Sequence, residues 1–339
     1  MEYGSDFHNC KFPLLPHITE RKDCRMYACG RHAIGALLQQ QSFKRIWIPT
    51  YFCYEVVDYI RIYNIDVCFY EDNPLCENEQ NVVEKLPFQI GDVLLRMNYF
   101  GMRSKRTCKD IPVPVIEDHS HGLMTNWALQ SDADWCIASI RKTLPSIAGG
   151  ILWSPRGRIL PDSLGVTPEM VFLSTIRYQA MELKRKYLEG ENVQKDDFRQ
   201  LYVQTEEQLG KLSLSGMDTL TKNIFLSINL SQWEMKKQRN RFIVNQTLDP
   251  RFVLLGRDDN ESMFFSLVLL TNSEQERECL RNYLIAHQIY PAVLWRIPTS
   301  CEDIVAQNIS KRLLSIHCDG RYDEDEMKRM CLIINNFYS

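Results

Sequence analysis

Between residues 31 and 155, short apolar stretches alternate with segments of helical spacing, and this alternation constrains the fold more than any other feature of the chain. Apolar residues recur at helical spacing in 31–41 and 54–63. The expected strands are short and apolar and cover 45–51, 65–71, 91–101, 113–122, 133–140 and 149–155. Strands that alternate with helices in this way favour a mostly parallel sheet covered on both faces. Ligands of such sheets bind at the carboxyl ends of the strands.

The second half of the chain carries a different pattern. Charged, helix-favouring residues predict helices in 174–190 and 195–214. From residue 262 onward, a β-α-β-β-α pattern predicts a smaller α+β unit. We therefore expect an α/β protein with a large domain over residues 20–215 and a small C-terminal domain over 220–339. Residues 1–20 are expected to be able to pack with the small domain.

Charge and hydropathy exclude several classes of protein. The formal net charge is −3, so no basic field indicates binding to nucleic acid or to an anionic membrane. No apolar run reaches the ~18–20 residues that span a bilayer. The N-terminal residues lack a basic region followed by an apolar core, so no signal peptide is expected. These observations favour a cytoplasmic protein.

The twelve cysteines do not form a metal-binding pattern. They include no C-x-x-C pair, and several lie inside apolar runs, as Cys68, Cys136 and Cys331 do. A free cysteine packs as a small apolar side chain, and a reducing compartment keeps it in that form. We therefore expect neither a structural zinc site nor a disulfide framework.

Polar side chains follow three of the expected strands, at or just past the point where each strand ends. Asn98 lies near the end of the strand run at 91–101, Asp118 closely follows the apolar run of 113–116, and Ser139 to Lys142 lie at or just past the end of the strand run at 133–140. Each residue also has an ordinary explanation, because strand-end acids bond to backbone N–H groups and loop lysines are usually solvated. The strand order nevertheless predicts that they lie along one edge of the sheet.

Gly30, Arg31 and His32 open the first expected helix. A helix start offers unpaired N–H groups and the positive end of the helix dipole to an anion such as phosphate. Taken alone this signal is weak, since most helix starts bind nothing. Pyridoxal 5'-phosphate (PLP), however, needs three features in the order found here. They are a helix start, then an acid at a strand end, then a lysine at a strand end. N–H groups bind the phosphate of PLP, a carboxylate keeps its pyridine nitrogen protonated, and a lysine amine binds its aldehyde.

Several segments resemble, in order and spacing, the sugar aminotransferases of the DegT/DnrJ/StrS family. They are "CGRHAIGALL", "IPTYFCYEVVDYI", "NYFGM", "VPVIEDHSHGL", "SIRKTLPSIAGG" and, near the C-terminus, "LLSIHCDGRYDEDEMKRMCLIIN". The resemblance covers most of the chain and is patchy between residues 155 and 280. It implies the type I fold of PLP enzymes, a homodimer and small-molecule substrates. It also implies amination of a keto sugar, usually nucleotide-linked, with glutamate or glutamine as the amino donor.

The resemblance assigns roles residue by residue. Lys142 corresponds to the lysine that binds PLP covalently, and Asp118 to the partner of the pyridine nitrogen. His121, three residues after Asp118, matches the Gln or His that touches the cofactor ring or its 3-hydroxyl. The remaining cofactor-binding positions are the helix start at Gly30, Arg31 and His32, the hydroxyl of Ser139, and Asn98 where the family often carries His.

Three departures from the family pattern bear on the site. The aromatic residue that usually stacks on the cofactor ring aligns with Cys53, so stacking would pass to one of its neighbours Tyr51, Phe52 or Tyr54, or to His121. The segment before Lys142 differs from the family's commonest form. The run "G-x-N-x-R", which normally reaches into the partner subunit's site, is replaced by a stretch that offers Arg177 and Tyr178 as substitutes.

Three alternatives stay open. A degenerate family member would bind a nucleotide sugar or a partner protein without catalysis, which the departures favour and the intact Asp118 and Lys142 oppose. A PLP-dependent sugar dehydratase is less favoured, because such enzymes typically replace the lysine by histidine. A metal site made of Asp118, His119 and His121 is weaker again, since an H-x-H pair on an extended segment presents both rings to one face but no third ligand has metal spacing.

Overall fold

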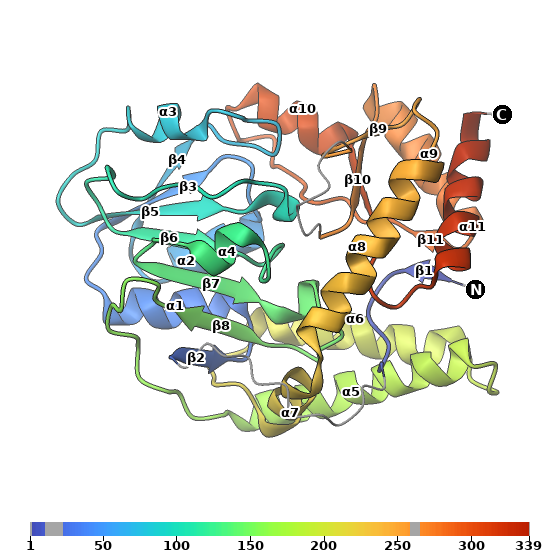
Figure 1. Cartoon of the computed structure of the whole chain (residues 1–339). Helices are drawn as coiled ribbons and strands as arrows, with labels where there is room; N and C mark the ends of the chain where they lie inside the picture. Colours follow the sequence, from blue (N-terminus) through green and yellow to red (C-terminus); the bar gives the residue numbers. More distant parts are fainter. Residues whose placement is uncertain (1, 11–22, 258–264, 339) are drawn as a thin grey trace.

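The computed structural model describes residues 2–10, 23–257 and 265–338, and its largest element is a seven-stranded sheet (Figure 1). The strands lie in the order β2-β8-β7-β6-β5-β3-β4, and β3 to β7 are parallel to one another. β8 is antiparallel to β7, and β2 is antiparallel to β8. The strands are β2 (Cys24–Tyr27), β3 (Arg45–Pro49), β4 (Asp66–Tyr70), β5 (Asp92–Met97), β6 (Val115–Asp118), β7 (Trp135–Ser139) and β8 (Gly150–Trp153).

Helices cover both faces of this sheet, so the predicted α/β class is confirmed. Alternate residues of the parallel strands enter two separate apolar cores, as Ile46 and Trp47 of β3 do, because successive strand side chains point to opposite faces. The connecting elements are α1 (Gly30–Gln40), α2 (Tyr54–Arg61), α3 (Glu79–Val83), η1 (Tyr99–Gly101), α4 (Asn126–Gln130) and η2 (Ile140–Lys142).

A smaller antiparallel sheet lies in the C-terminal part and has the strand order β12-β10-β9. Its strands and the neighbouring elements are β9 (Val253–Leu254), β10 (Leu267–Leu270), α9 (Glu274–Ala286), β11 (Ile289–Tyr290), α10 (Ile304–Arg312), β12 (Leu313–Ile316), α11 (Glu324–Asn335) and η3 (Asn336–Tyr338). The N-terminal strand β1 (Tyr3–Gly4) pairs with β11 in parallel. The division of the chain into two domains at about residue 215 stays a prediction.

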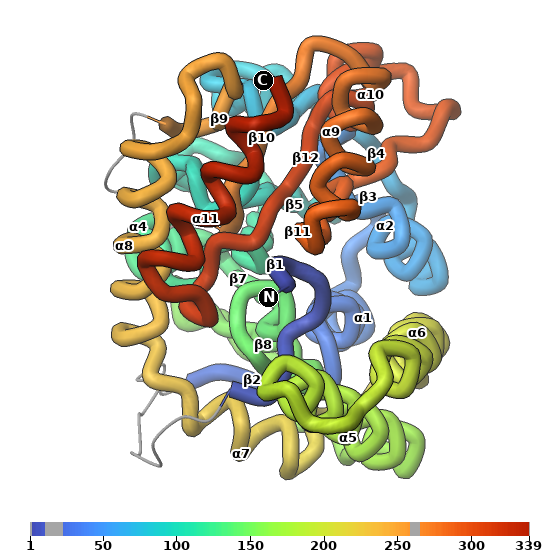
Figure 2. The backbone as a smooth tube through the Cα atoms, turned by 90° about the vertical axis from the view of Figure 1, so that its right-hand side faces the viewer, coloured from blue at the N-terminus to red at the C-terminus, as the bar shows by residue number. Residues whose placement is uncertain are grey.

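Along the chain, four helices follow the last strand of the large sheet and precede the first strand of the small sheet. They are α5 (Pro168–Leu188), α6 (Lys195–Lys211), α7 (Thr219–Ser227) and α8 (Leu230–Thr247). Thr167 caps α5 by accepting from the Met170 N–H, and Pro168 begins the helix where its missing N–H costs nothing. Figure 2 shows the N-terminal segment descending from β1 toward the α5–α6 pair. The Asn9 N–H donates to the Met181 carbonyl of α5 at 3.1 Å, which fixes this segment against the pair. Among the described residues, no helix is long and apolar enough to span a bilayer.

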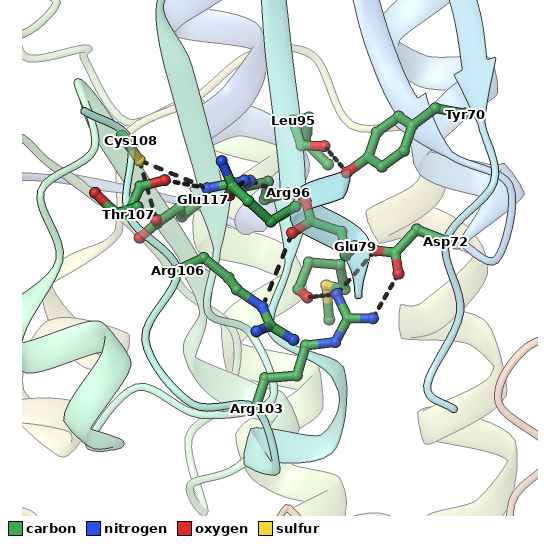
Figure 3. A network of polar contacts seen from close by, with 12 residues as sticks. Tyr70, Asp72, Glu79, Leu95, Arg96, Arg103, Arg106, Thr107, Cys108 and Glu117 are labelled. Atoms are coloured by element: carbon green, nitrogen blue, oxygen red, sulfur yellow. Dashed lines mark hydrogen bonds and ion pairs between the residues drawn. The ribbon is translucent and has the colours of Figure 1, made fainter. Parts of the chain in front are cut away.

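A buried polar network holds the chain segments that follow β4 and β5 (Figure 3). Arg103 donates to the carboxylate of Asp72 at 2.8 Å, and Arg96 Nε donates to Glu79 Oε1 at 2.9 Å. The guanidinium of Arg103 also lies over the ring of Tyr99, 4.5 Å from its centroid. Because charges this deeply buried are tolerated only when they are paired, the network fixes the turn that leaves β5.

Candidate active site

The carboxyl ends of three neighbouring parallel strands meet at one edge of the large sheet. In the β5–β6 pair Met97 lies opposite Asp118, and in the β6–β7 pair Asp118 lies opposite Ile137. The Asn98 N–H, just beyond β5, donates to the Asp118 carbonyl at 3.0 Å. The strand order therefore places Asn98, Asp118 and Ser139 along one edge, as the sequence pattern indicates.

A cavity of about 70 Å³ opens at this edge and joins most of the residues singled out in the sequence. Its walls are Cys29, Gly30, Arg31, Cys53, Glu55, Val56, Asp118, Ser120, Ile137, Ser139, Arg141 and Lys142. Four residues predicted to bind a cofactor are not part of these walls: His32, Tyr54, Asn98 and His121.

The start of helix α1 forms one wall of this cavity. Its N-cap, Cys29, makes no side-chain cap, so no cap side chain satisfies the first N–H groups of the helix. Neighbouring chain segments approach each other closely here. A Cβ added to Gly150 would lie 2.2 Å from the Cys29 carbonyl oxygen, and one added to Gly30 would lie 3.1 Å from Ser139 Cβ. The two glycines therefore allow the helix start and the strand ends to share one cavity that suits an anion.

Asp118 presents part of its carboxylate to the cavity. Its Oδ1 accepts from the Ser120 N–H at 2.8 Å, an arrangement typical of an acid at a strand end. Within the described ranges, its other oxygen has no hydrogen-bond partner, and the residue is only 7% exposed. The Ser120 hydroxyl in turn accepts from the Ser139 N–H at 2.9 Å, which ties the end of β7 to the turn after β6.

Lys142 ends the 3₁₀ turn η2 and lies between two cavities. Its Nζ is 5.4 Å from the ring centroid of Trp295, which comes from the C-terminal part of the chain. Trp295 also packs against Tyr51 and Phe52. Lys142 is thus held near an aromatic surface where its amine can face either cavity.

His121 and His119 lie in different surroundings, so the expectation that both rings share one face is wrong. β6 ends at Asp118, and the chain then turns instead of staying extended. The ring of His121 stacks on Phe265 and Trp295, at centroid distances of 4.4 and 5.1 Å. His119 Nε2 instead contacts Glu117 Oε2 at 3.0 Å. The two imidazoles and Asp118 therefore do not form a common metal site.

His121 is a buried, neutral hydrogen-bond donor. Its Nδ1 accepts from the Phe100 N–H at 3.3 Å, so its Nε2 carries the proton. Burial, together with the charge of Lys142, holds the pKa of His121 well below its ordinary value. In the part of the chain that the structure describes, the Nε2 of His121 has no partner.

The other predicted residues outside the cavity walls have structural contacts. The ring of His32 contacts the Leu212 carbonyl and accepts from the Ser215 N–H, so only its backbone faces the helix start. Tyr54 stacks on Phe69. The amide nitrogen of Asn98 contacts Thr125 Oγ1 and His119 Nδ1, while its oxygen is buried and has no partner among the described residues.

A second cavity, of about 280 Å³, adjoins the first and shares Arg141 and Lys142 with it. Arg177 lines this second cavity, whereas Tyr178 points away to Asn9. Five residues of the C-terminal part also line this cavity: Phe265, Ala292, Leu294, Ser315 and His317. The sequence analysis did not identify them, because no local motif marks them.

Comparisons with known proteins give a match by structure. No protein-family model matches the sequence, and no curated protein matches it. NtdA from Bacillus subtilis, solved with bound cofactor PMP, has a TM-score of 0.62 at 11% identity, over 93% of this chain and 74% of that one. Helicobacter pylori PseC, an aminotransferase involved in the biosynthesis of pseudoaminic acid, has a TM-score of 0.62 at 12% identity, over 94% and 87%. A DegT/DnrJ/EryC1/StrS aminotransferase from Brucella abortus has a TM-score of 0.58 at 12% identity, over 94% and 86%. The chain therefore has the fold that these three structures share, that of the type I PLP enzymes.

Proposed function

We propose that the protein is a PLP-dependent aminotransferase that transfers an amino group from an amino acid to a keto sugar. One observation carries the proposal. Lys142, Asp118 and the start of helix α1, which are distant in the sequence, line a single cavity at the carboxyl edge of the sheet. The solved structures with the same fold support it, because two of them are aminotransferases and a third contains PMP.

The donors at this site fit PLP. The uncapped start of α1 offers N–H groups to a phosphate, and Ser139 lines the same cavity with its hydroxyl-bearing side chain. The second oxygen of Asp118 is available to a protonated pyridine nitrogen, and the amine of Lys142 to an aldehyde. When bound, PLP supplies an electron sink for the charge that develops at the substrate's α-carbon.

Each residue then has a defined task. With PLP bound, the carboxylate of Asp118 would keep the pyridine nitrogen protonated. Lys142 would hold the cofactor in place, and its Nζ would be the group that moves the proton of the substrate's α-carbon. The ring of Trp295 borders the amine of Lys142 on one side, 5.4 Å from its Nζ.

The finer assignments rest on the family resemblance. We propose glutamate or glutamine as the amino donor, a nucleotide-linked keto sugar as the acceptor, and a homodimer as the working form. The presence of Lys142 at the cavity disfavours a sugar dehydratase, since those enzymes typically carry histidine at this position.

A second candidate function, binding without catalysis, has one observation in its favour. The walls of the 70 Å³ cavity include Cys53 and, among the described residues, no aromatic side chain. A cofactor ring would therefore lack the stacking partner that the family usually provides. Tyr51, Phe52 and His121 pack on Trp295 and do not line this cavity.

The experiment is a visible absorbance spectrum after the protein is loaded with PLP and dialysed. We expect a cofactor band that survives dialysis, that is lost in Lys142→Ala and that is kept in the control Lys109→Ala, because Lys109 is an exposed lysine away from the cavity. Adding glutamate should then bleach the band and release 2-oxoglutarate. If the wild-type protein binds the cofactor but glutamate and other amino acids leave the band unchanged, binding without catalysis is the better account.

A further inference from the structure

The cavity on the far side of Lys142 contains two arginines that share one carboxylate. Arg141 directly precedes Lys142, and Arg177 comes from α5. Arg141 Nη2 lies 2.6 Å from Glu206 Oε1, and Arg177 Nη1 lies 3.2 Å from Glu206 Oε2. The carboxylate of Glu206, in α6, thus bridges the two guanidiniums.

The three partners differ in their freedom to move. Arg177 is 4% exposed, and it is anchored by a hydrogen bond to Thr205 Oγ1 at 3.2 Å and by the ring of Tyr202. The side chain of Arg141 is 21% exposed, and its Nε is buried without a partner among the described residues. The side chain of Glu206 is 46% exposed. The carboxylate can therefore swing into solvent while the guanidiniums stay in place.

We propose that Arg141 and Arg177 form the subsite for the carboxylate of the amino-acid substrate, and that Glu206 occupies this subsite when no substrate is bound. The inference rests on the proposed function, because it assumes that the amino-acid substrate reacts at Lys142. The cavity that Arg141 and Arg177 line also contains Lys142, which places the subsite beside the reacting amine.

A count of charges explains why Glu206 must leave. Two guanidiniums now face two carboxylates, since Arg177 Nη2 also lies 3.0 Å from Asp6 Oδ1. A substrate carboxylate added to this group would set three carboxylates against two guanidiniums, and like charges repel most strongly where water is scarce. When Glu206 swings out, the substrate restores the original balance. Glu206 therefore competes with substrate and weakens its binding.

The chemistry of the subsite favours a carboxylate. Arginine presents two N–H groups in a planar fork that matches the two oxygens of a carboxylate. The Glu206 carboxylate already uses one oxygen for each guanidinium, so a second carboxylate can take over the same contacts. A phosphate is the other oxyanion that arginine forks bind, and the experiment separates the two.

The test is titration calorimetry of the PLP-loaded protein with glutarate, a dicarboxylate that carries no amine and cannot react. We expect Glu206→Gln to bind glutarate about fivefold more tightly than wild type, the equivalent of releasing one partly exposed ion pair. The matched control is Glu207→Gln, since Glu207 is the next residue of α6 and is exposed. It should bind glutarate as wild type does. Arg177→Lys keeps the charge but loses the fork, and should bind glutarate several-fold more weakly.

Two results would overturn the proposal. One is an unchanged glutarate affinity in Glu206→Gln, a variant of a half-exposed residue that is expected to fold. The other is a gain in affinity for inorganic phosphate in Glu206→Gln that equals the gain for glutarate. The heat of binding requires no turnover, so a protein without transaminase activity that still shows these glutarate effects would refute the proposed function and leave the anion subsite standing.

Discussion

Replacing Arg96 with methionine removes one half of an ion pair that solvent does not reach. The side chains of Arg96 and Glu79 are both 0% exposed, and Arg96 also donates to the Thr107 carbonyl at 2.9 Å. Burial raises the pKa of Glu79 and the charge of Arg96 opposes that rise, so the loss of Arg96 raises the pKa of this buried carboxyl further.

The magnitude follows from the charge that is left behind. Removing one partner of a buried ion pair typically costs about 3–5 kcal/mol, because the other charge stays unpaired in the interior. The unpaired Thr107 carbonyl contributes about 1 kcal/mol of this cost. We therefore expect Arg96→Met to lower the free energy of unfolding by about 3–5 kcal/mol, the usual cost of breaking a buried pair.

The assay is urea unfolding followed by tryptophan fluorescence, with Arg61→Met as the matched control. Arg61 and Asp58 are also 2.9 Å apart, but their side chains are 52% and 69% exposed. The control should therefore cost less than about 1 kcal/mol. The double variant Arg96→Met, Glu79→Leu should regain part of the loss, because both charges of the buried pair are then gone and Arg106 alone loses its 3.8 Å contact with Glu79. A cost in Arg96→Met no larger than in Arg61→Met would refute the reasoning.

Two further predictions concern the glycine at the cavity and the buried histidines. Gly150→Ala should abolish retention of PLP or unfold the protein, because the new Cβ would lie 2.2 Å from the Cys29 carbonyl oxygen. Dialysis measures the retention of PLP, and circular dichroism measures folding. Full retention of PLP with an unchanged circular dichroism spectrum would contradict this prediction. Burial lowers the pKa of His121 and His32, and that of His8 to about 4, so the unfolded chain binds more protons than the native state below about pH 6.5. The free energy of unfolding should therefore fall as the pH drops from about 6.5 toward 4, and a flat profile over this window in urea titrations would count against neutral buried imidazoles.

Most strands of the large sheet could be predicted because each is a short apolar run, and α1 and α2 because their buried residues recur at helical spacing. Strand direction could not be predicted for β8, since an antiparallel strand has the same apolar pattern as a parallel one. Helix α8 was missed for a different reason. Its buried face includes Glu234, Lys237 and Asn240, which satisfy one another or the backbone near Asp319, so no apolar stripe marks it.

The candidate site could be predicted in part. Asp118, Ser139 and Lys142 lie in short motifs at strand ends, and the strand order brings them to one cavity, although their roles stay predictions. Trp295 and Arg177 reach the site from more distant elements. A tryptophan or an arginine in isolation has no spacing to mark it, and surface arginines are common, so only the folded chain shows that these two lie beside Lys142.

The most direct test of the account is to find where PLP attaches. The PLP-loaded protein is reduced with borohydride, which makes the bond between the cofactor and an amine permanent, and its peptides are then sequenced by mass spectrometry. The account predicts a stoichiometric pyridoxyl group on Lys142 and none on the control Lys109. Label on another lysine, or no label on a folded protein that has been saturated with PLP, would contradict the assignment of Lys142 and with it the proposed aminotransferase.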